Sequence, residues 1–220
     1  MPRACVLVRL PPARSSPMHA YSDRINHAFA FAAKHHRGPG SASPGSLGHP
    51  ANVAVILARY SCDQPTLVAG ILHHVLEDAT PERRETLEDK VGEKFGPVVL
   101  AIAKDACEPK YGLRGEERPW RARKHDLLAH LAVAEPRALD IITADEIHRC
   151  GSTIAALRRL GAEYLRPVSQ ATSEETIWWY RSMTEVLASR PDWPQRPMLD
   201  EIRTLGGDLV RHLRETEDDL

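Results

Sequence analysis

The sequence predicts an all-α protein. Aromatic residues make up only 5% of the 220 residues, while hydrophobic residues make up 42%. The core must therefore be largely aliphatic and rich in alanine, which suits packed helices. Apolar residues recur at three- and four-residue spacing along most of the chain, and no stretch shows the two-residue alternation of a strand. The length allows one good-sized domain or two small ones.

Composition and charge exclude several classes of protein. The formal net charge is -1 and there is no long basic stripe, so neither nucleic acid nor a membrane surface is an expected partner. The longest apolar runs are far shorter than the ~20 residues that a membrane-spanning helix needs. The four cysteines are scattered and none forms a C-x-x-C pair, which argues against a thiolate zinc site. They are typical of reduced thiols in a cytoplasmic protein.

The first half of the chain divides into short helices. Residues 1–18 contain arginine and proline but no acid, and we expect them to be disordered or an over-extended start, with Met18 as an alternative initiator. A helix is predicted over 21–36, followed by a Gly-, Ser- and Pro-rich loop that leads into His49-Pro50. A histidine between such a loop and the first turn of a helix is well placed to point into a cleft. Further helices are predicted from Pro50 to about residue 61, from Asp63 or Thr66 to about 78, over 80–95 and from residue 98.

The second half follows the same pattern. Residues 108–119 carry both charges and predict a loop, and a helix is expected over 120–134. Pro136 opens a helix that includes residues 145–149, and a separate short helix follows and ends at Gly161. After a helix around 177–187, a proline-rich link over 191–197 leads to a last amphipathic helix and a frayed acidic tail over 215–220.

Candidate chemistry concentrates in two of these helices. His73 and His74 are followed by Glu77 and Asp78, so residues four apart share a helix face, and the apolar run before them predicts a buried helix. Four groups that can bind a metal or move protons then face a cavity. The alternative is a solvated polar face at a helix end. Asp145 lies on an otherwise apolar helix, where a carboxylate needs a cation or a metal unless it is half-exposed at the helix edge.

The order of these signals resembles a known family. His49-Pro50 comes first, then His73-His74-x-x-Glu77-Asp78, then Phe95-Gly96, then Ala144-Asp145-x-Ile147-His148. Together they resemble the HD-domain phosphohydrolase superfamily, in particular the Rel/Spo-type (p)ppGpp hydrolase domain and its small stand-alone relatives. The resemblance covers about residues 21–187, and Trp120-x-x-Arg123-Lys124 and Trp179-Tyr180-Arg181 add to it.

The resemblance implies a fold and an activity. The fold would be a single-domain HD-type helical bundle around a metal cleft over residues 19–190, with the linker, helix and tail of 191–220 packed on it or appended to it. One divalent ion, usually Mn²⁺, would be held by His49, His73, His74 and Asp145. Glu77 and Asp78 would position or activate the attacking water. The reaction would remove the 3′-pyrophosphate of an alarmone. No synthetase half is expected, so the protein would degrade rather than make its nucleotide, and a homo-oligomer is one option for its assembly.

Three departures from the family pattern fall at this site. His74 stands where the family has aspartate, the loop over 38–48 lacks the family's arginine, and Arg149 replaces an asparagine. Three imidazoles and one carboxylate suit Zn, Fe or Ni, whereas Mn²⁺ should bind less well. Because the three departures lie at one site, the sequence predicts loss of hydrolysis as readily as it predicts retained hydrolysis.

These observations leave three hypotheses. In the first, the protein is a metal-dependent phosphohydrolase, and Arg149, Lys124 or Arg123 neutralises the phosphates of a nucleotide substrate. In the second, it is a catalytically impaired homologue that binds a nucleotide or a protein partner without turnover. In the third, it is a helical interaction domain in which the clustered histidines are incidental.

Overall fold

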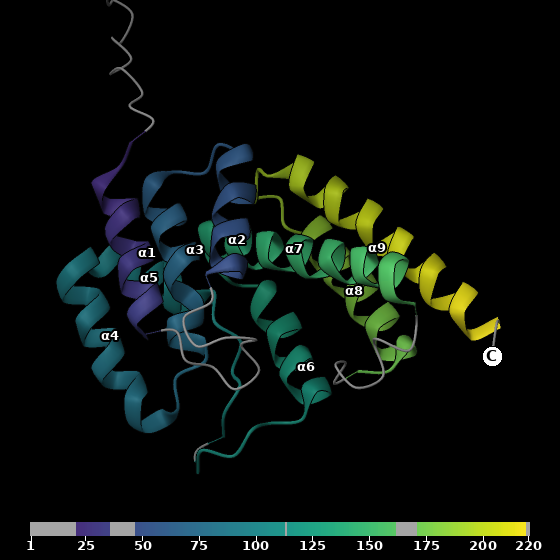
Figure 1. Ribbon diagram of the computed structural model, residues 1–220, viewed down its shortest axis with the longest axis horizontal. Helices are drawn as coiled ribbons and strands as arrows, with labels where there is room; N and C mark the ends of the chain where they lie inside the picture. Colours follow the sequence, from purple (N-terminus) through teal and green to yellow (C-terminus); the bar gives the residue numbers. More distant parts are fainter. Residues whose placement is uncertain (1–20, 36–46, 113, 162–170, 219–220) are drawn as a thin grey trace, which may run out of the picture.

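Most of the chain that the structure describes is helical. The computed structural model describes residues 21–35, 47–112, 114–161 and 171–218, so the predictions for 1–18 and for most of the loop before His49 lie outside these ranges. Within them the all-α prediction is confirmed (Figure 1). The helices are α1 (Asp23–His35), α2 (Gly48–Arg59), α3 (Gln64–Glu77), α4 (Pro81–Phe95), α5 (Pro97–Asp105), α6 (Trp120–Leu131), α7 (Pro136–Leu160), α8 (Ser173–Ala188) and α9 (Arg196–Asp218).

Helix α3 lies at the centre of the first half of the molecule. It packs against α1, α2, α4, α5 and α7 (Figure 1). Its residues 68–77 are all buried, as the apolar run around the helix predicts. Of the two candidate caps, Asp63 is the one used, and its Oδ1 accepts the backbone N–H of Thr66 at 2.9 Å. The histidine pair therefore lies inside the protein, at the last turn of a helix enclosed by others.

Helix α7 corrects one prediction. The separate helices expected before and after residue 150 form one helix of 25 residues. Gly151 does not break it, because a single glycine weakens a helix by only about 1 kcal/mol and the flanking Cys150 and Ile154 are buried. Helix α7 can then pack along α9 as well as against α2, α3 and α5. It connects the two halves of the molecule (Figure 1).

The C-terminal part also differs from the prediction. Helix α9 begins at Arg196, inside the stretch expected to be a link, and Pro197 occupies its first turn, where a proline is tolerated. The helix continues to Asp218, so much of the expected tail is helical. Trp193, just before α9, is fully buried and donates its indole N–H to Asp140 Oδ1 of α7 at 2.7 Å. This bond attaches the connection between α8 and α9 to the core.

The connection between α5 and α6 is irregular. Residues 107–119 include one isolated antiparallel bridge, between Tyr111 and Glu117. This segment passes close to the end of α3 and contributes side chains to the site described below. Among the described helices, none is long and apolar enough to cross a membrane.

Candidate metal centre

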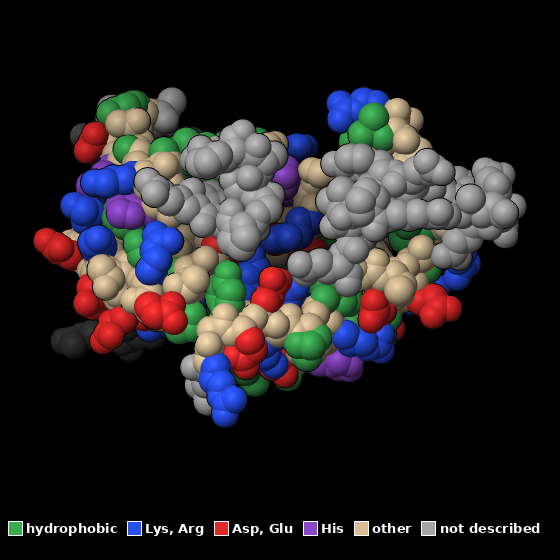
Figure 2. Space-filling model, turned by 60° about the horizontal axis from the view of Figure 1, so that its bottom comes forward, with side chains coloured by type: hydrophobic (Ala, Val, Ile, Leu, Met, Phe, Trp, Pro, Cys, Tyr) green, Lys and Arg blue, Asp and Glu red, His purple; other side chains and the backbone are tan. Residues whose placement is uncertain are grey.

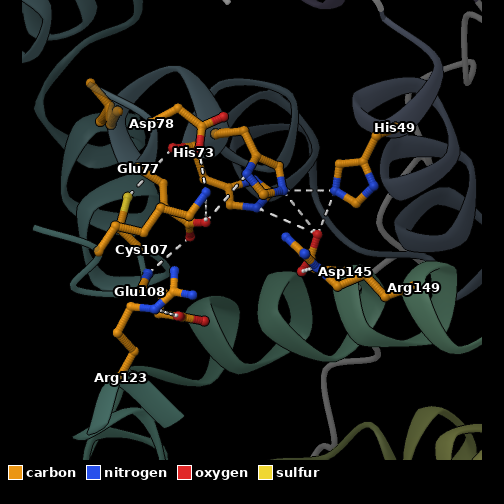
Figure 3. Close-up of polar contacts among 12 residues, drawn as sticks. His49, His73, Glu77, Asp78, Cys107, Glu108, Arg123, Asp145 and Arg149 are labelled. Atoms are coloured by element: carbon orange, nitrogen blue, oxygen red, sulfur yellow. Dashed lines mark hydrogen bonds and ion pairs between the residues drawn. The ribbon is translucent and has the colours of Figure 1, made fainter. Parts of the chain in front are cut away.

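Four side chains predicted as metal ligands come together from three helices. His49 is in the first turn of α2, His73 and His74 are in the last turns of α3, and Asp145 is in the middle of α7 (Figure 3). Asp145 Oδ1 lies 2.5 Å from His49 Nε2, 3.0 Å from His74 Nε2 and 4.0 Å from His73 Nε2. The Nε2 atoms of His49 and His74 are 2.7 Å apart. The Nε2 atoms of His49 and His74 and Asp145 Oδ1 thus face one small volume, and His73 forms a second group with His74 and Glu77 beside it.

Backbone and side-chain partners orient the rings. His73 Nδ1 donates to the carbonyl oxygen of Gly70 at 2.7 Å, which leaves the Nε2 lone pair facing the cluster. His49 Nδ1 lies 2.7 Å from His148 Nδ1, so His148 can hold the outer side of this ring. His148, the last residue of the motif that contains Asp145, is thus in contact with His49. An orienting partner on the outer nitrogen is the usual arrangement around a metal-bound histidine.

Burial and charge act in opposite directions on the two adjacent histidines. Burial, followed by the charge of His74, lowers the pKa of His73 to about 3, so this ring is neutral. Burial also opposes a charge on His74, but Glu77 and Asp145 outweigh it and raise its pKa to about 9. Burial opposes the charge of Asp145 as well, yet Arg149 and the neighbouring imidazoles keep its pKa well below the usual range. The site is therefore built to stabilise positive charge beside an ionised carboxylate.

The donor set fits a first-row divalent ion. Ligand atoms about 2.0–2.1 Å from an ion are separated from one another by about 2.8–3.0 Å in octahedral geometry and by about 3.3–3.4 Å in tetrahedral geometry. The 3.0 Å between His74 Nε2 and Asp145 Oδ1 agrees with octahedral geometry, while the 2.7 and 2.5 Å from His49 Nε2 to these two atoms are shorter. All three ligand atoms lie within 4.8 Å of one another. Two Nε2 atoms as close as those of His49 and His74 cannot both keep a proton, whereas one cation can accept both lone pairs. These residues could hold a metal ion, and the geometry does not select which one.

Glu77 and Asp78, predicted as catalytic acids, lie at the edge of the cluster. Glu77 is 5% exposed, and its Oε1 is 3.5 Å from His74 Nδ1. Lys110 contacts both acids and lies 3.2 Å from Glu77 Oε1. Burial opposes the charge of Glu77, but His74 and Lys110 outweigh it and lower its pKa well below the usual value. Glu77 is therefore an enclosed carboxylate that is held in its ionised form.

The three predicted phosphate-binding cations differ in their surroundings. Arg149 is partly exposed, and its Nε donates to Asp145 Oδ2 at 2.6 Å, one turn along α7. Lys124 is buried, with Nζ 2.7 Å from Glu108 Oε2 and 3.0 Å from Glu146 Oε1. Arg123 is also buried, with Nε 3.3 Å from Glu108 Oε1. Carboxylates already neutralise both of these cations. Binding of substrate by Lys124 and Arg123 stays a prediction.

A hollow of about 370 Å³ opens beside the cluster. Figure 2 shows a face of the molecule on which Lys and Arg side chains gather near the middle, close to Asp and Glu side chains. The hollow contains His49, Arg149 and Lys124 together with hydroxyl and aromatic groups. A larger hollow of about 680 Å³ between α5 and α6 includes none of the predicted site residues. The smaller hollow is thus the one that adjoins the possible metal ligands. Its remaining lining residues are Trp120, Glu146, His148, Ser152, Thr153, Ala171, Thr176, Trp179 and Tyr180.

Sequence reasoning missed three contributors to the site. Glu108 and Lys110 come from the irregular connection after α5, and no periodicity places such residues. The ion pair between Asp145 and Arg149 was also missed, although a spacing of four residues on a helix predicts contact.

Comparison with known proteins identifies the class. Residues 28–165, more than half of the chain, match the family described as "HD domain". The chain therefore belongs to the HD-domain family, and the proteins that it resembles place it in the Rel/Spo-type branch.

Two curated relatives carry that assignment. The chain is 28% identical over 179 residues to the bifunctional (p)ppGpp synthase/hydrolase SpoT of Escherichia coli (strain K12). The matched region covers 79% of this chain and 25% of that protein. It is 34% identical over 90 residues to the guanosine-3′,5′-bis(diphosphate) 3′-pyrophosphohydrolase of Aquifex aeolicus (strain VF5), covering 40% of this chain and 12% of that protein. The chain thus spans a quarter or less of the length of these relatives.

Solved structures show the same fold. Lmo0812 from Listeria monocytogenes EGD-e superposes with a TM-score of 0.61 at 22% identity, covering 74% of this chain and 99% of that one. A structure titled as a metazoan ortholog of SpoT that hydrolyses ppGpp superposes with a TM-score of 0.54 at 21% identity, covering 92% and 98% of the two chains. At these identities the likeness establishes the fold alone.

Proposed function

We propose that this protein is a metal-dependent phosphohydrolase that acts on a nucleotide, and that its substrate is a guanosine polyphosphate of the (p)ppGpp type. The convergence of His49, His74 and Asp145 carries this proposal, with His73 and Glu77 grouped around His74 on the inner side of the same cluster. The names of the curated relatives support the choice of nucleotide.

Each group at the site has a separate role in the proposed hydrolysis. A divalent ion held by the four ligands would supply Lewis acidity, lowering the pKa of a coordinated water towards ~7 and attracting phosphate oxygens. Glu77, which lies at the edge of the cluster with Oε1 3.5 Å from His74 Nδ1, would accept the proton that the attacking water gives up. Asp78 and Lys110 form an ion pair next to it and hold this edge of the site. Arg149 reaches the hollow from α7 and neutralises negative charge on the phosphates.

The family resemblance and the ligand types favour different ions. The family resemblance favours Mn²⁺, whereas three imidazoles and one carboxylate favour Zn, Fe or Ni. We therefore propose a single divalent ion and expect activity to depend strongly on which of these ions is supplied.

Turnover of ppGpp tests the proposal. The protein is stripped with chelator, loaded with Mn, Zn, Fe or Ni in turn and incubated with ppGpp, and the products are separated by anion exchange. We expect GDP and pyrophosphate, one water being consumed for each ppGpp. The His73→Ala and Asp145→Ala variants should lose this activity while the His125→Ala control, in which an exposed histidine of α6 is replaced, keeps it. Wild-type turnover in both site variants would show that the site is wrongly assigned.

One contact favours a second candidate function. The guanidinium of Arg149 already occupies one oxygen of Asp145, which places a fixed cation next to the possible metal site. A protein with this arrangement could bind a nucleotide through the same hollow without hydrolysing it. Measurable ppGpp binding with no turnover under any of the four metals would favour this non-catalytic role.

A further inference from the structure

We propose that Lys124 is a positioning residue, which holds the carboxylate of Glu77 in place through Glu108. This inference rests on the proposed function, in which Glu77 accepts a proton from water. It gives Lys124 a role different from the phosphate binding that its charge predicts.

Lys124 is enclosed by groups that satisfy its charge. Its side chain projects from α6, and the residue is 6% exposed. The ammonium contacts Glu108 and Glu146 at 2.7 and 3.0 Å, and it lies 4.4 Å from the centre of the Trp179 ring. Two carboxylates and an aromatic face leave this cation little capacity for a phosphate. Its charge is therefore used inside the protein.

Glu108 transmits this anchoring to Glu77. The backbone N–H of Glu108 donates to Glu77 Oε2 at 2.9 Å, and Figure 3 shows the two residues facing each other. Glu108 lies after the end of α5, in the irregular connection, so no helix ladder holds its peptide group. Its side chain is tied to α6 by Lys124 and lies close to Arg123. The direction of the N–H that Glu77 receives therefore depends on the anchored side chain.

Glu77 needs this support because its other neighbours act on one oxygen only. Oε1 lies near His74 and Lys110, whereas Oε2 receives the Glu108 N–H. Without the second contact the carboxylate can turn about its last side-chain bond. A misplacement of about 1 Å in a reacting group can lower a rate by about a hundredfold.

Steady-state kinetics distinguish positioning from phosphate binding. In the Lys124→Met variant we expect kcat for ppGpp to fall by at least about tenfold with KM within about twofold of the natural value. The Lys124→Arg variant should recover much of kcat, since it restores the charge. The matched control is Lys104→Met. It removes an exposed lysine of α5 that pairs with Glu88 of α4. A rise in KM with unchanged kcat would overturn the proposal in favour of phosphate binding.

A double-mutant cycle tests whether the effect passes through Glu77. In the Glu77→Gln background, Lys124→Met should lower kcat by no more than about twofold, because the group it positions is already absent. If the two losses multiply instead, Lys124 acts independently of Glu77 and the proposal fails.

Backbone hydrogen exchange provides a readout that does not require turnover. Measured by NMR on the full chain, exchange of the Glu108 amide should be slow in the natural protein and at least about tenfold faster in Lys124→Met, and unchanged in Lys104→Met. Unchanged exchange in Lys124→Met overturns the inference even if the protein proves inactive. If Lys124→Met does not fold, Glu108→Gln tests the same link, because it removes the side-chain charge that holds this peptide group and leaves the amide in place.

Discussion

Replacing Arg149 with glutamine should strengthen the binding of a divalent metal ion. Arg149 Nε bonds Asp145 Oδ2, while Asp145 Oδ1 faces the three imidazoles. An ion bound at Oδ1 would therefore lie within about 6 Å of a guanidinium whose pKa is raised well above its ordinary value, first by Asp145. Glutamine can still donate to the carboxylate four residues before it on the helix, so the exchange removes the charge and keeps a hydrogen bond.

The size of the effect follows from Coulomb's law. A single and a double positive charge about 6 Å apart repel by about 5 kcal/mol at an effective dielectric constant of about 20, and by about 1.4 kcal/mol in water. The Arg149 side chain is 44% exposed, so solvent screens much of this repulsion. We expect a gain of about 1–2 kcal/mol in binding free energy, which is about five- to thirtyfold in Kd.

Calorimetric titration of chelator-stripped protein measures this gain. Zn²⁺ and Mn²⁺ are titrated separately into the natural protein, Arg149→Gln and the charge-retaining control Arg149→Lys. The control should bind within about threefold of the natural protein, because the charge remains. If Arg149→Gln binds either ion no more tightly than the natural protein, then Arg149 does not oppose the metal, and the assignment of Asp145 Oδ1 as a ligand is wrong.

Two further predictions concern His73 and Asp140. His73→Ala should weaken metal binding by at least about tenfold in calorimetry, because it removes the nitrogen that the bond to Gly70 directs at the cluster. Burial raises the pKa of Asp140 to about 6, although Trp193 stabilises its ionised form. A folded-state pKa above the unfolded one of 3.8 means that stability is complete below about pH 4 and is lost as pH rises to about 6. Asp140→Asn should abolish this loss, which amounts to about 2–3 kcal/mol, as urea denaturation between pH 4 and 7 can measure.

Each of these has its own contrary outcome. Metal binding by His73→Ala as tight as that of the His125→Ala control would remove His73 from the ligand set. For Asp140, the quantity compared is the difference in unfolding free energy between the two proteins, so the titration of other groups cancels. A difference that stays constant from pH 4 to 7 would mean that Asp140 titrates normally in the folded state.

The helices could largely be predicted, because local patterns decide them. Helix α4 illustrates this, since Pro81 starts it, Leu87, Val91 and Phe95 form its buried face, and Gly96 with a positive φ ends it. Where tertiary packing decides, the prediction was wrong. Gly151 marks a break by local rules, yet α7 continues through it because α9 packs along its length.

The candidate site divides in a similar way. His49, His73, His74 and Asp145 were predicted as ligands from residue type and order. The structure brings His49, His74 and Asp145 together, and it places His73 beside them in a second group with His74 and Glu77. The environment of Lys124 could not be predicted from the sequence. Its partners Glu108 and Glu146 lie in different elements, and only the fold brings them together. A sequence shows that a lysine is charged, but not whether carboxylates already surround it.

Metal content most directly tests the central claim, that three histidines and Asp145 form a divalent metal site. The natural protein and a His74→Asp variant are purified without chelator and analysed by elemental mass spectrometry. We expect about one divalent ion per chain in the natural protein, and a shift of preference towards Mn²⁺ in His74→Asp, because a carboxylate replaces an imidazole. No bound ion in the natural protein, together with a filled site in His74→Asp, would contradict the account and favour a binding protein without catalysis.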